Sequence, residues 1–293
     1  FRLEGDLRQN YVPQMSWAGG SDAVFIQQSN RLQNTYKVLL GDPATGAVRP
    51  VMVERDAAWV EANAAPEWLN GGKRFTWLSE RDGWRHLYTI DRASGRAILR
   101  TPGRFDVIDL LKVDEKAGYA WFIASPDNPT QRYLYRTTLT GTPRVERLTP
   151  ANQPGTHSYD IAPGEHWALH TVSRFDAPPV TDMLDLTRQK PLRTLVDNAP
   201  LAALVADTGL PATEFFRVDI GDGTGSQPVA RRIDLVDEAA LDRSPLRQID
   251  RQRIDPERRG RDDEPVVGRI DIDHPSRIGR SRDKDRPLQQ VRH

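Results

Sequence analysis

Four histidines are the residues best suited to chemistry in this sequence: His86, His157, His166 and His170. A histidine can act as the general base of acyl transfer when an exposed serine stands beside it on a strained turn. The sequence signature of that turn is G-x-S-x-G. Gly223-Thr-Gly-Ser226 does not match it, and no other segment does. We therefore predict no catalytic residue in this chain, and we expect the histidines in the core or on the surface of a sheet.

Metal and cofactor chemistry are also not expected. His166 and His170 have the i,i+4 spacing that suits a metal on a helix, but Gly164 and the alternating Trp167-Ala-Leu-His run predict a turn and a strand. The absence of cysteine excludes a thiolate zinc site and a disulfide framework. Gly221-Asp-Gly-Thr-Gly225 is a weak match to a phosphate-binding loop, because no helix is predicted after it. We predict neither a metal nor a cofactor.

Aromatic residues divide the chain into two parts. The seven Trp, seven Tyr and eight Phe residues all lie at or before Phe216, so only the first part can build a large apolar core. The formal net charge is zero, so the chain as a whole has no positive electrostatic field that would attract nucleic acid. No apolar run reaches the roughly 18 residues that a bilayer span requires, so no membrane segment is expected.

The sequence says less about where the natural protein begins and in which compartment it is found. The chain begins with neither a Met nor the apolar stretch of a signal peptide, so we expect it to derive from a longer protein. The absence of cysteine does not fix the compartment. A periplasmic or secreted location is slightly favoured over a cytoplasmic one.

Short strands are predicted from about residue 10 to residue 220. Apolar or alternating runs bounded by Gly, Pro, Asp or Asn lie at Ala23–Gln28, Tyr36–Leu40, Arg74–Leu78, Leu87–Ile90, Ala120–Ala124 and Trp167–Val172. The one helix candidate, at Pro200–Thr208, is weak. These features predict an all-β fold.

An internal period organises these strands. The turn glycines Gly46, Gly95 and Gly141 are 49 and 46 residues apart, and Thr187-Arg188 continues the series without a glycine. A second set of turn glycines, at positions 72, 118 and 164, recurs every 46 residues. A four-stranded repeat of about 40–50 residues is the size of one β-propeller blade. We predict four blades, at 10–55, 56–104, 105–150 and 151–197. Part of a larger ring is favoured over a closed four-bladed ring.

The segment from Thr224 to His293 differs in kind. It is rich in Arg and Asp, its one lysine is Lys284, and it has neither aromatic residues nor a sustained period. Three interpretations stay open: a charged interaction tail, a disordered segment, or an out-of-frame translation of GC-rich DNA. Because acids are interleaved with its arginines, it offers no basic patch for nucleic acid. We therefore divide the chain into a domain at 1–223 and a low-order tail at 224–293.

The first part resembles the dipeptidyl peptidase IV family of the prolyl oligopeptidase clan. The resemblance rests on Trp77–Tyr88 (WLSERDGWRHLY) and on segments that agree in order and spacing, Tyr11–Trp17, Gln27–Asn34, Arg55–Val60 and Phe215–Gly223. It covers about residues 8–223 and breaks off at Thr224, which favours the out-of-frame interpretation of the tail. In that family an eight-bladed propeller sits over an α/β-hydrolase domain. The resemblance thus implies about four blades of an eight-bladed ring, with the catalytic domain outside this chain.

The resemblance also implies a function. Intact relatives release Xaa-Pro-like dipeptides from peptide N-termini, the propeller gates the substrate, and a homodimer is expected. The paired glutamates that hold the substrate amine would lie upstream of residue 1, and no Glu-Glu pair occurs here. The loop from Trp59 to Ala65 points toward the active site in some relatives, so Glu61 and Asn63 are the candidate substrate-facing residues. A plain inter-blade loop is the alternative.

Two functions remain open on this evidence. The first is the non-catalytic, substrate-gating part of a dipeptidyl peptidase, inactive alone, whose partner is a peptide bound together with the hydrolase domain. The second is a stand-alone propeller that binds a protein partner.

Overall fold

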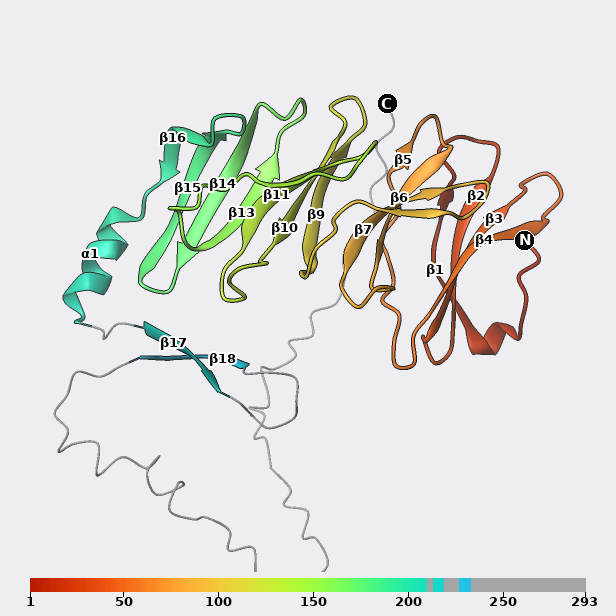
Figure 1. The fold of residues 1–293 in the computed structure, drawn as a ribbon, viewed down its shortest axis with the longest axis horizontal. Helices are drawn as coiled ribbons and strands as arrows, with labels where there is room; N and C mark the ends of the chain where they lie inside the picture. Colours follow the sequence, from red (N-terminus) through yellow and green to blue (C-terminus); the bar gives the residue numbers. More distant parts are fainter. Residues whose placement is uncertain (210–212, 219–226, 233–293) are drawn as a thin grey trace, which may run out of the picture. The chain divides into compact units, whose positions relative to one another are not determined.

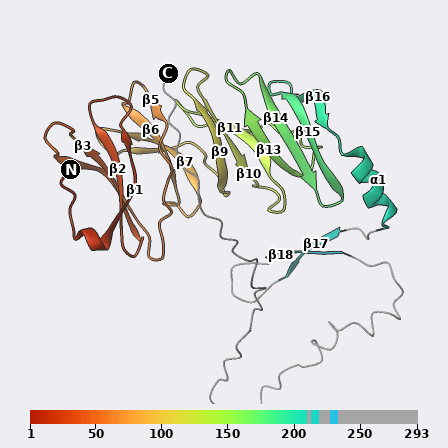
Figure 2. The same cartoon turned by 180° about the vertical axis from the view of Figure 1, so that it is seen from behind.

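Antiparallel β-strands make up most of the chain in the computed structural model, which describes residues 1–209, 213–218 and 227–232 (Figure 1). Four four-stranded sheets follow one another along the chain, and in each of them consecutive strands pair as a meander. Figure 2 shows the same succession from the other side. The predicted all-β class and the four predicted blades are confirmed.

The four sheets have the following strands. The first sheet has β1 (Asn10–Trp17), β2 (Val24–Asn30), β3 (Thr35–Gly41) and β4 (Val48–Arg55). The second has β5 (Trp68–Leu69), β6 (Arg74–Ser79), β7 (His86–Asp91) and β8 (Ala97–Leu99). The third has β9 (Val107–Asp114), β10 (Tyr119–Ala124), β11 (Tyr133–Thr138) and β12 (Val145–Arg147). The fourth has β13 (Thr156–Ile161), β14 (Trp167–Arg174), β15 (Ala177–Asp185) and β16 (Lys190–Val196).

The remaining elements are short. A 3₁₀ turn, η1, spans Leu7–Gln9, and one helix, α1, spans Ala199–Asp207, close to the weak candidate in the sequence. Strand β17 (Thr213–Val218) pairs with β18 (Gln227–Arg232) in a two-stranded sheet. The predicted boundary between residues 223 and 224 falls within 219–226, outside the described residues, as do 233–293 of the predicted tail.

Glycines with positive φ make the turns between the third and fourth strands of the first two sheets. Gly46 and Gly95 both have φ +71°, and each donates its backbone N–H to the carbonyl of an aspartate four residues earlier, at 2.8 Å. A non-glycine residue pays a steric penalty in this conformation, whereas glycine does not. The period seen in the sequence is therefore the repeat of one turn geometry.

The fourth sheet keeps this turn without a glycine. Gln189 has φ +52° and stands four residues after Asp185, as Gly46 stands four residues after Asp42. The side-chain amide of Gln189 donates to the carbonyl of Leu186 at 2.7 Å. Asp185 accepts the backbone N–H groups of Thr187 and Arg188 at 3.0 and 2.8 Å. These local hydrogen bonds offset the strain that the glutamine backbone carries.

Each sheet packs face to face on the next through buried apolar side chains. Between the first and second sheets, Phe25 contacts Phe75 with ring centroids 5.5 Å apart, and Trp77 lies in the same cluster. The third sheet meets the second through a cluster that includes Phe122 and Leu78, and it meets the fourth through one that includes Trp121. Removing one such aromatic side chain typically costs about 3–5 kcal/mol. Stacking therefore holds the sheets together and positions the loops at their ends.

Candidate functional site

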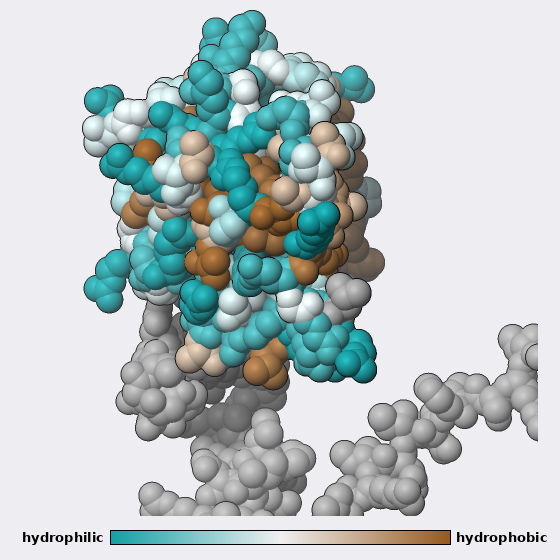
Figure 3. All heavy atoms as spheres, turned by 90° about the vertical axis from the view of Figure 1, so that its right-hand side faces the viewer, coloured by the Kyte–Doolittle hydropathy of each residue, from teal (hydrophilic) through white to brown (hydrophobic). Residues whose placement is uncertain are grey.

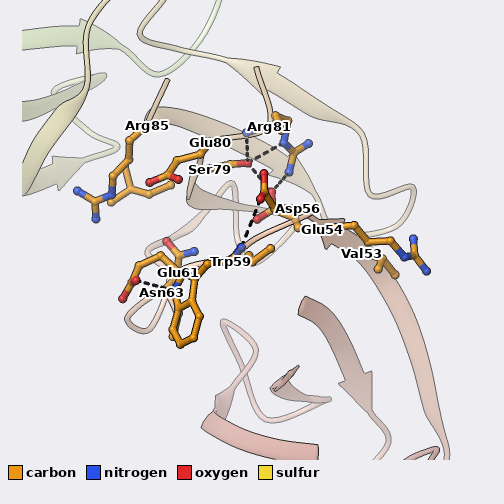
Figure 4. A pocket seen from close by; sticks show the side chains of 14 residues that line it. Val53, Glu54, Asp56, Trp59, Glu61, Asn63, Ser79, Glu80, Arg81 and Arg85 are labelled. Atoms are coloured by element: carbon orange, nitrogen blue, oxygen red, sulfur yellow. Dashed lines mark hydrogen bonds and ion pairs between the residues drawn. The ribbon is translucent and has the colours of Figure 1, made fainter. Parts of the chain in front are cut away.

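A pocket of about 360 Å³ opens where the loop after β4 meets the β6–β7 hairpin (Figure 4). Its walls come from the end of the first sheet and the start of the second, so the packing of these two sheets positions both sides. The lining side chains include acids, arginines and one large aromatic ring: Val53, Glu54, Arg55, Asp56, Trp59, Val60, Glu61, Ala62, Asn63, Leu78, Ser79, Glu80, Arg81 and Arg85.

A three-residue polar cluster links the two sheets at this pocket. Arg81 Nη2 and Ser79 Oγ each lie 2.5 Å from Glu54 Oε1, and Arg81 Nε donates to Ser79 Oγ at 2.9 Å. The Glu54 side chain is only 9% exposed. The Arg81 guanidinium also lies 4.8 Å from the centroid of the Tyr88 ring. Because a buried carboxylate is stabilised by paired donors, this cluster holds β4 and the β6–β7 hairpin in a fixed relation.

The loop that carries the predicted residues is held at its start by an aspartate. Asp56 Oδ1 accepts the backbone N–H groups of Ala58 at 2.8 Å and of Trp59 at 3.3 Å. These two hydrogen bonds, the one from Ala58 first, hold the pKa of Asp56 below its usual value. Val60 donates its N–H to the Gln33 carbonyl at 2.8 Å, which ties the loop to the β2–β3 turn.

Glu61 and Asn63 line the pocket from this loop, as Figure 4 shows. Trp59 Nε1 donates to Glu61 Oε2 at 3.0 Å, so the indole orients this carboxylate. Beyond Asn63, the Ala64 carbonyl accepts from Gln27 Nε2 at 3.2 Å, and Gln27 Oε1 also accepts from the Tyr36 hydroxyl. Burial raises the pKa of Tyr36 to about 12, so this hydroxyl stays protonated. The structure places both predicted residues at one pocket, and their contact with a substrate stays a prediction.

Arg85 connects the pocket to the third sheet. Its Nη1 donates to the carbonyl oxygens of Val107 at 2.7 Å and Ile108 at 3.0 Å, and its backbone N–H donates to Asp106 Oδ1 at 2.8 Å. These bonds make Arg85, the second arginine of the segment WLSERDGWRHLY, a support of the pocket wall.

Ser79, His86 and Asp82 lie close together without forming a catalytic triad. His86 Nδ1 is 2.9 Å from Asp82 Oδ2, and Ser79 is the partner of His86 in the β6–β7 register. However, Ser79 Oγ is bonded to Glu54 and Arg81, and His86 Nε2 has no hydrogen-bond partner among the described residues. His86 is 2% exposed and packs edge-on against Phe105. Without a serine–histidine bond this group cannot generate a nucleophile.

Two more histidines pair with each other in the fourth sheet. His157 and His170 are buried, and they hydrogen-bond to each other rather than pairing His170 with His166. His166 is exposed in the turn before β14. Among the described residues, no three His, Asp or Glu side chains gather in a way that could hold a metal ion.

Sequence reasoning missed Glu54, Ser79 and Arg81 as pocket residues. Their contacts join β4 to a hairpin in the next sheet, and nothing in the spacing of these residues reveals that contact. The one available signal for Glu54 was the alternation of side chains between the two faces of β4, which places Glu54 on the face toward the second sheet. In the part of the chain that the structure describes, no helix has the length and apolar character needed to cross a membrane.

Comparisons with known proteins agree on one family. The model of the dipeptidyl peptidase IV (DPP IV) N-terminal region matches residues 3–179. A probable dipeptidyl peptidase 4 of Emericella nidulans is 24% identical over 74% of this chain and 29% of its own length. A probable dipeptidyl-aminopeptidase B of the same organism is 29% identical over 75% of this chain and 26% of its own length.

A solved structure has the same fold. The crystal structure of Porphyromonas gingivalis dipeptidyl peptidase 4 matches 78% of this chain and 31% of its own, with a TM-score of 0.64 and 22% sequence identity. The chain thus spans less than a third of the length of these relatives. Since the family model covers more than half of its residues, the chain belongs to the dipeptidyl peptidase IV family and corresponds to part of that family's N-terminal propeller region.

Proposed function

We propose that this chain supplies a substrate-gating part of a serine dipeptidyl peptidase that removes dipeptides from peptide N-termini, and that the Ser-Asp-His chemistry comes from an α/β-hydrolase domain outside it. The observation that carries the proposal is the pocket lined by Trp59, Glu61 and Asn63. It combines an aromatic surface, a carboxylate and an amide, which suit a peptide's apolar side chains, its amine and its backbone. The relatives, named as dipeptidyl peptidases, support the substrate class.

The rigid support of the pocket favours binding over chemistry. The ion pair between buried Glu54 and partly exposed Arg81 and the loop bonds of Asp56 hold the walls in place before a ligand arrives. A preformed site loses less entropy on binding than a flexible one. With no serine–histidine bond at this site, the chain is proposed to bind the peptide and leave cleavage to the hydrolase domain.

Isothermal titration calorimetry tests this proposal. A short peptide that begins Ala-Pro and has a free amine is titrated into the chain, and its N-acetylated form is the control ligand. Glu61→Gln and Asn63→Ala are each expected to weaken binding about three- to tenfold, the effect of losing one polar contact. Ser173→Ala is the matched control, because Ser173 lines a second pocket, away from this loop.

The outcomes separate the two functions. Binding that needs the free amine and responds to Glu61→Gln supports the peptidase role. If no peptide binds, or if only Ser173→Ala weakens binding, the proposal is wrong and the alternative of a protein-binding propeller gains support. No release of dipeptide by the chain alone is expected in either case.

A further inference from the structure

The outer side of the first sheet presents apolar residues inside a polar rim (Figure 3). Met15 and Trp17 of β1 are exposed on this side, on the face of the sheet opposite to Phe25 and the second sheet. A propeller sheet buries both of its faces against neighbouring sheets, so the stacking of the fold accounts for this surface. The pocket beside Trp59, in contrast, has charged side chains that stacking does not use.

Glu80 is the acid of the pocket wall on the β6–β7 hairpin. It directly follows β6, and its backbone carbonyl accepts the N–H of Gly83 at 2.9 Å, which fixes its place in the turn. Glu80 is exposed and lines the pocket, and its side chain makes neither a hydrogen bond nor an ion pair with any residue that the structure describes. Its neighbour Ser79, in contrast, is bonded to Glu54. The carboxylate of Glu80 is therefore open to a ligand.

Glu80 stands across the pocket from the loop that carries Trp59 and Glu61 (Figure 4). Trp59 is 48% exposed, and its Nε1 donates to Glu61 Oε2 at 3.0 Å. This bond holds the Glu61 carboxylate beside the indole and leaves its Oε1 open to a ligand. The pocket thus offers two carboxylates on two different walls, with an exposed aromatic ring between its loop and its opening.

The charges of the pocket favour a cationic ligand. Outside the ion pair of Glu54 with Arg81, the charged lining residues are three acids and two arginines: Asp56, Glu61, Glu80, Arg55 and Arg85. The Nη1 group of Arg85 is directed toward the third sheet by its bonds to two backbone carbonyls. Negative charge is therefore in excess, and it attracts cations more strongly at low ionic strength than at high ionic strength.

A lysine or arginine side chain suits such a pocket. Its methylene stem packs on an apolar or aromatic surface while its cationic head binds a carboxylate. The ring of Trp59 offers the surface together with a cation–π attraction, and Glu80 offers the carboxylate. When this side chain belongs to the first residue of a peptide, its head and the α-amine are two cations of one residue. Two cations match the two open carboxylates of the pocket.

We propose that Glu80 determines specificity at this pocket by selecting peptides whose first residue is lysine or arginine. The inference rests on the proposed function, in which the peptide binds beside Trp59 and Glu61 receives its amine. Glu61 then acts on every peptide that has a free N-terminus, whereas Glu80 acts only on the side chain of the first residue.

Isothermal titration calorimetry with two peptides that differ only in their first residue tests the proposal. One peptide begins Lys-Pro and the other norleucine-Pro, because norleucine has a linear stem like that of lysine but no ammonium group. The whole chain is expected to bind the lysine peptide about two- to fivefold more tightly, the range of an exposed ion pair. This preference should shrink in about 0.5 M NaCl, which screens exposed charges.

Three variants locate the preference. Glu80→Gln should abolish it, and Glu80→Lys should reverse it, so that a peptide that begins Glu-Pro binds more tightly than the lysine peptide. Glu67→Gln is the matched control and should keep the preference, because Glu67 is an exposed acid that follows the same loop and does not line the pocket.

The outcomes separate the role of Glu80 from the proposed function. If the wild type binds both peptides equally, or if the preference survives Glu80→Gln, the role of Glu80 is overturned while peptide binding still supports the proposed function. If the preference disappears in Glu61→Gln and not in Glu80→Gln, Glu61 selects the side chain and the role of Glu80 is likewise overturned. If neither peptide binds the whole chain, the proposed function fails and this inference fails with it.

Discussion

His157 and His170 lie stacked across β13 and β14, with Nδ1 of His157 2.8 Å from Nε2 of His170. Nε2 of His157 lies 3.1 Å from the Gln153 carbonyl, so it must donate there. Nδ1 of His157 then carries no proton and accepts a hydrogen bond from Nε2–H of His170. The His157 ring is therefore neutral, and Tyr159 stacks against His170 at 4.6 Å between centroids.

This pair makes stability depend on pH. Burial is the main cause that lowers the pKa of His157, to about 4, and it also lowers the pKa of His170, against the opposing charge of Asp182. In the unfolded chain a histidine binds its proton near pH 6.5, so the unfolded state takes up protons first as the pH falls. The stability contributed by neutral His157 is therefore present above about pH 6.5 and is lost as the pH falls toward 4.

Urea unfolding at several pH values measures this loss. From pH 7 to pH 5 the free energy of unfolding is expected to fall by about 2 kcal/mol through His157 alone. His157→Phe should remove most of that dependence while keeping the aromatic stack. An equal slope in the wild type and in His157→Phe would show that other groups carry the effect.

Gly95→Ala tests the contact between the first two sheets. Gly95 has φ +71°, and a Cβ there would overlap the carbonyl oxygen of Val51 in β4. Gly71→Ala is the matched control, since Gly71 has φ +60° but open space around it. The control should cost about 1–2 kcal/mol from backbone strain, and Gly95→Ala should cost clearly more, measured by urea unfolding. Equal costs would mean that the sheets do not approach as described.

Gln189→Gly tests the turn without a glycine. Glycine relieves the strain at φ +52° but loses the hydrogen bond to the Leu186 carbonyl and gains freedom in the unfolded chain. We expect a net gain of about 0.5 kcal/mol in the free energy of unfolding, and a loss of about 1 kcal/mol for Gln189→Val. A clear loss for Gln189→Gly would show that the side-chain bond outweighs the strain.

The Glu54–Arg81 pair is expected to support the pocket as a unit. Arg81→Met leaves Glu54 buried beside Ser79 alone and should cost about 1–2 kcal/mol, a value reduced because Arg81 is partly exposed. Adding Glu54→Gln should recover part of this loss, because the unpaired charge is removed. Additive effects of the two substitutions in thermal unfolding would contradict the coupling.

The fold was largely predictable from the sequence because the residues that form its turns are close together along the chain. Gly46 and Gly95 mark one turn at one spacing, and the strands between them alternate or are apolar throughout. The fourth repeat was harder to see, since Gln189 replaces glycine and only the preceding Asp185 keeps the pattern. The sequence thus predicted each turn in which the backbone conformation, a positive φ, favours glycine.

The site was less predictable because its contacts are not local. Glu61 and Asn63 were named from a resemblance, and the structure places them at one pocket. The bond from Glu54 to Arg81 and the pairing of His157 with His170 depend on which strands become neighbours and in which register. Single-residue patterns carry no such information, so the polar support of the pocket became visible only in the folded chain.

Photo-crosslinking tests the central claim, that the pocket beside Trp59 receives a peptide, most directly. A peptide that begins Ala-Pro and carries a benzoylphenylalanine is irradiated with the whole chain, and the attachment sites are mapped by mass spectrometry. The account predicts crosslinks within 53–63 and 78–85, reduced by an excess of unlabelled peptide and by Glu61→Gln. Crosslinks confined to the second pocket, around Gln131 and Ser173, or labelling that unlabelled peptide does not reduce, would contradict it.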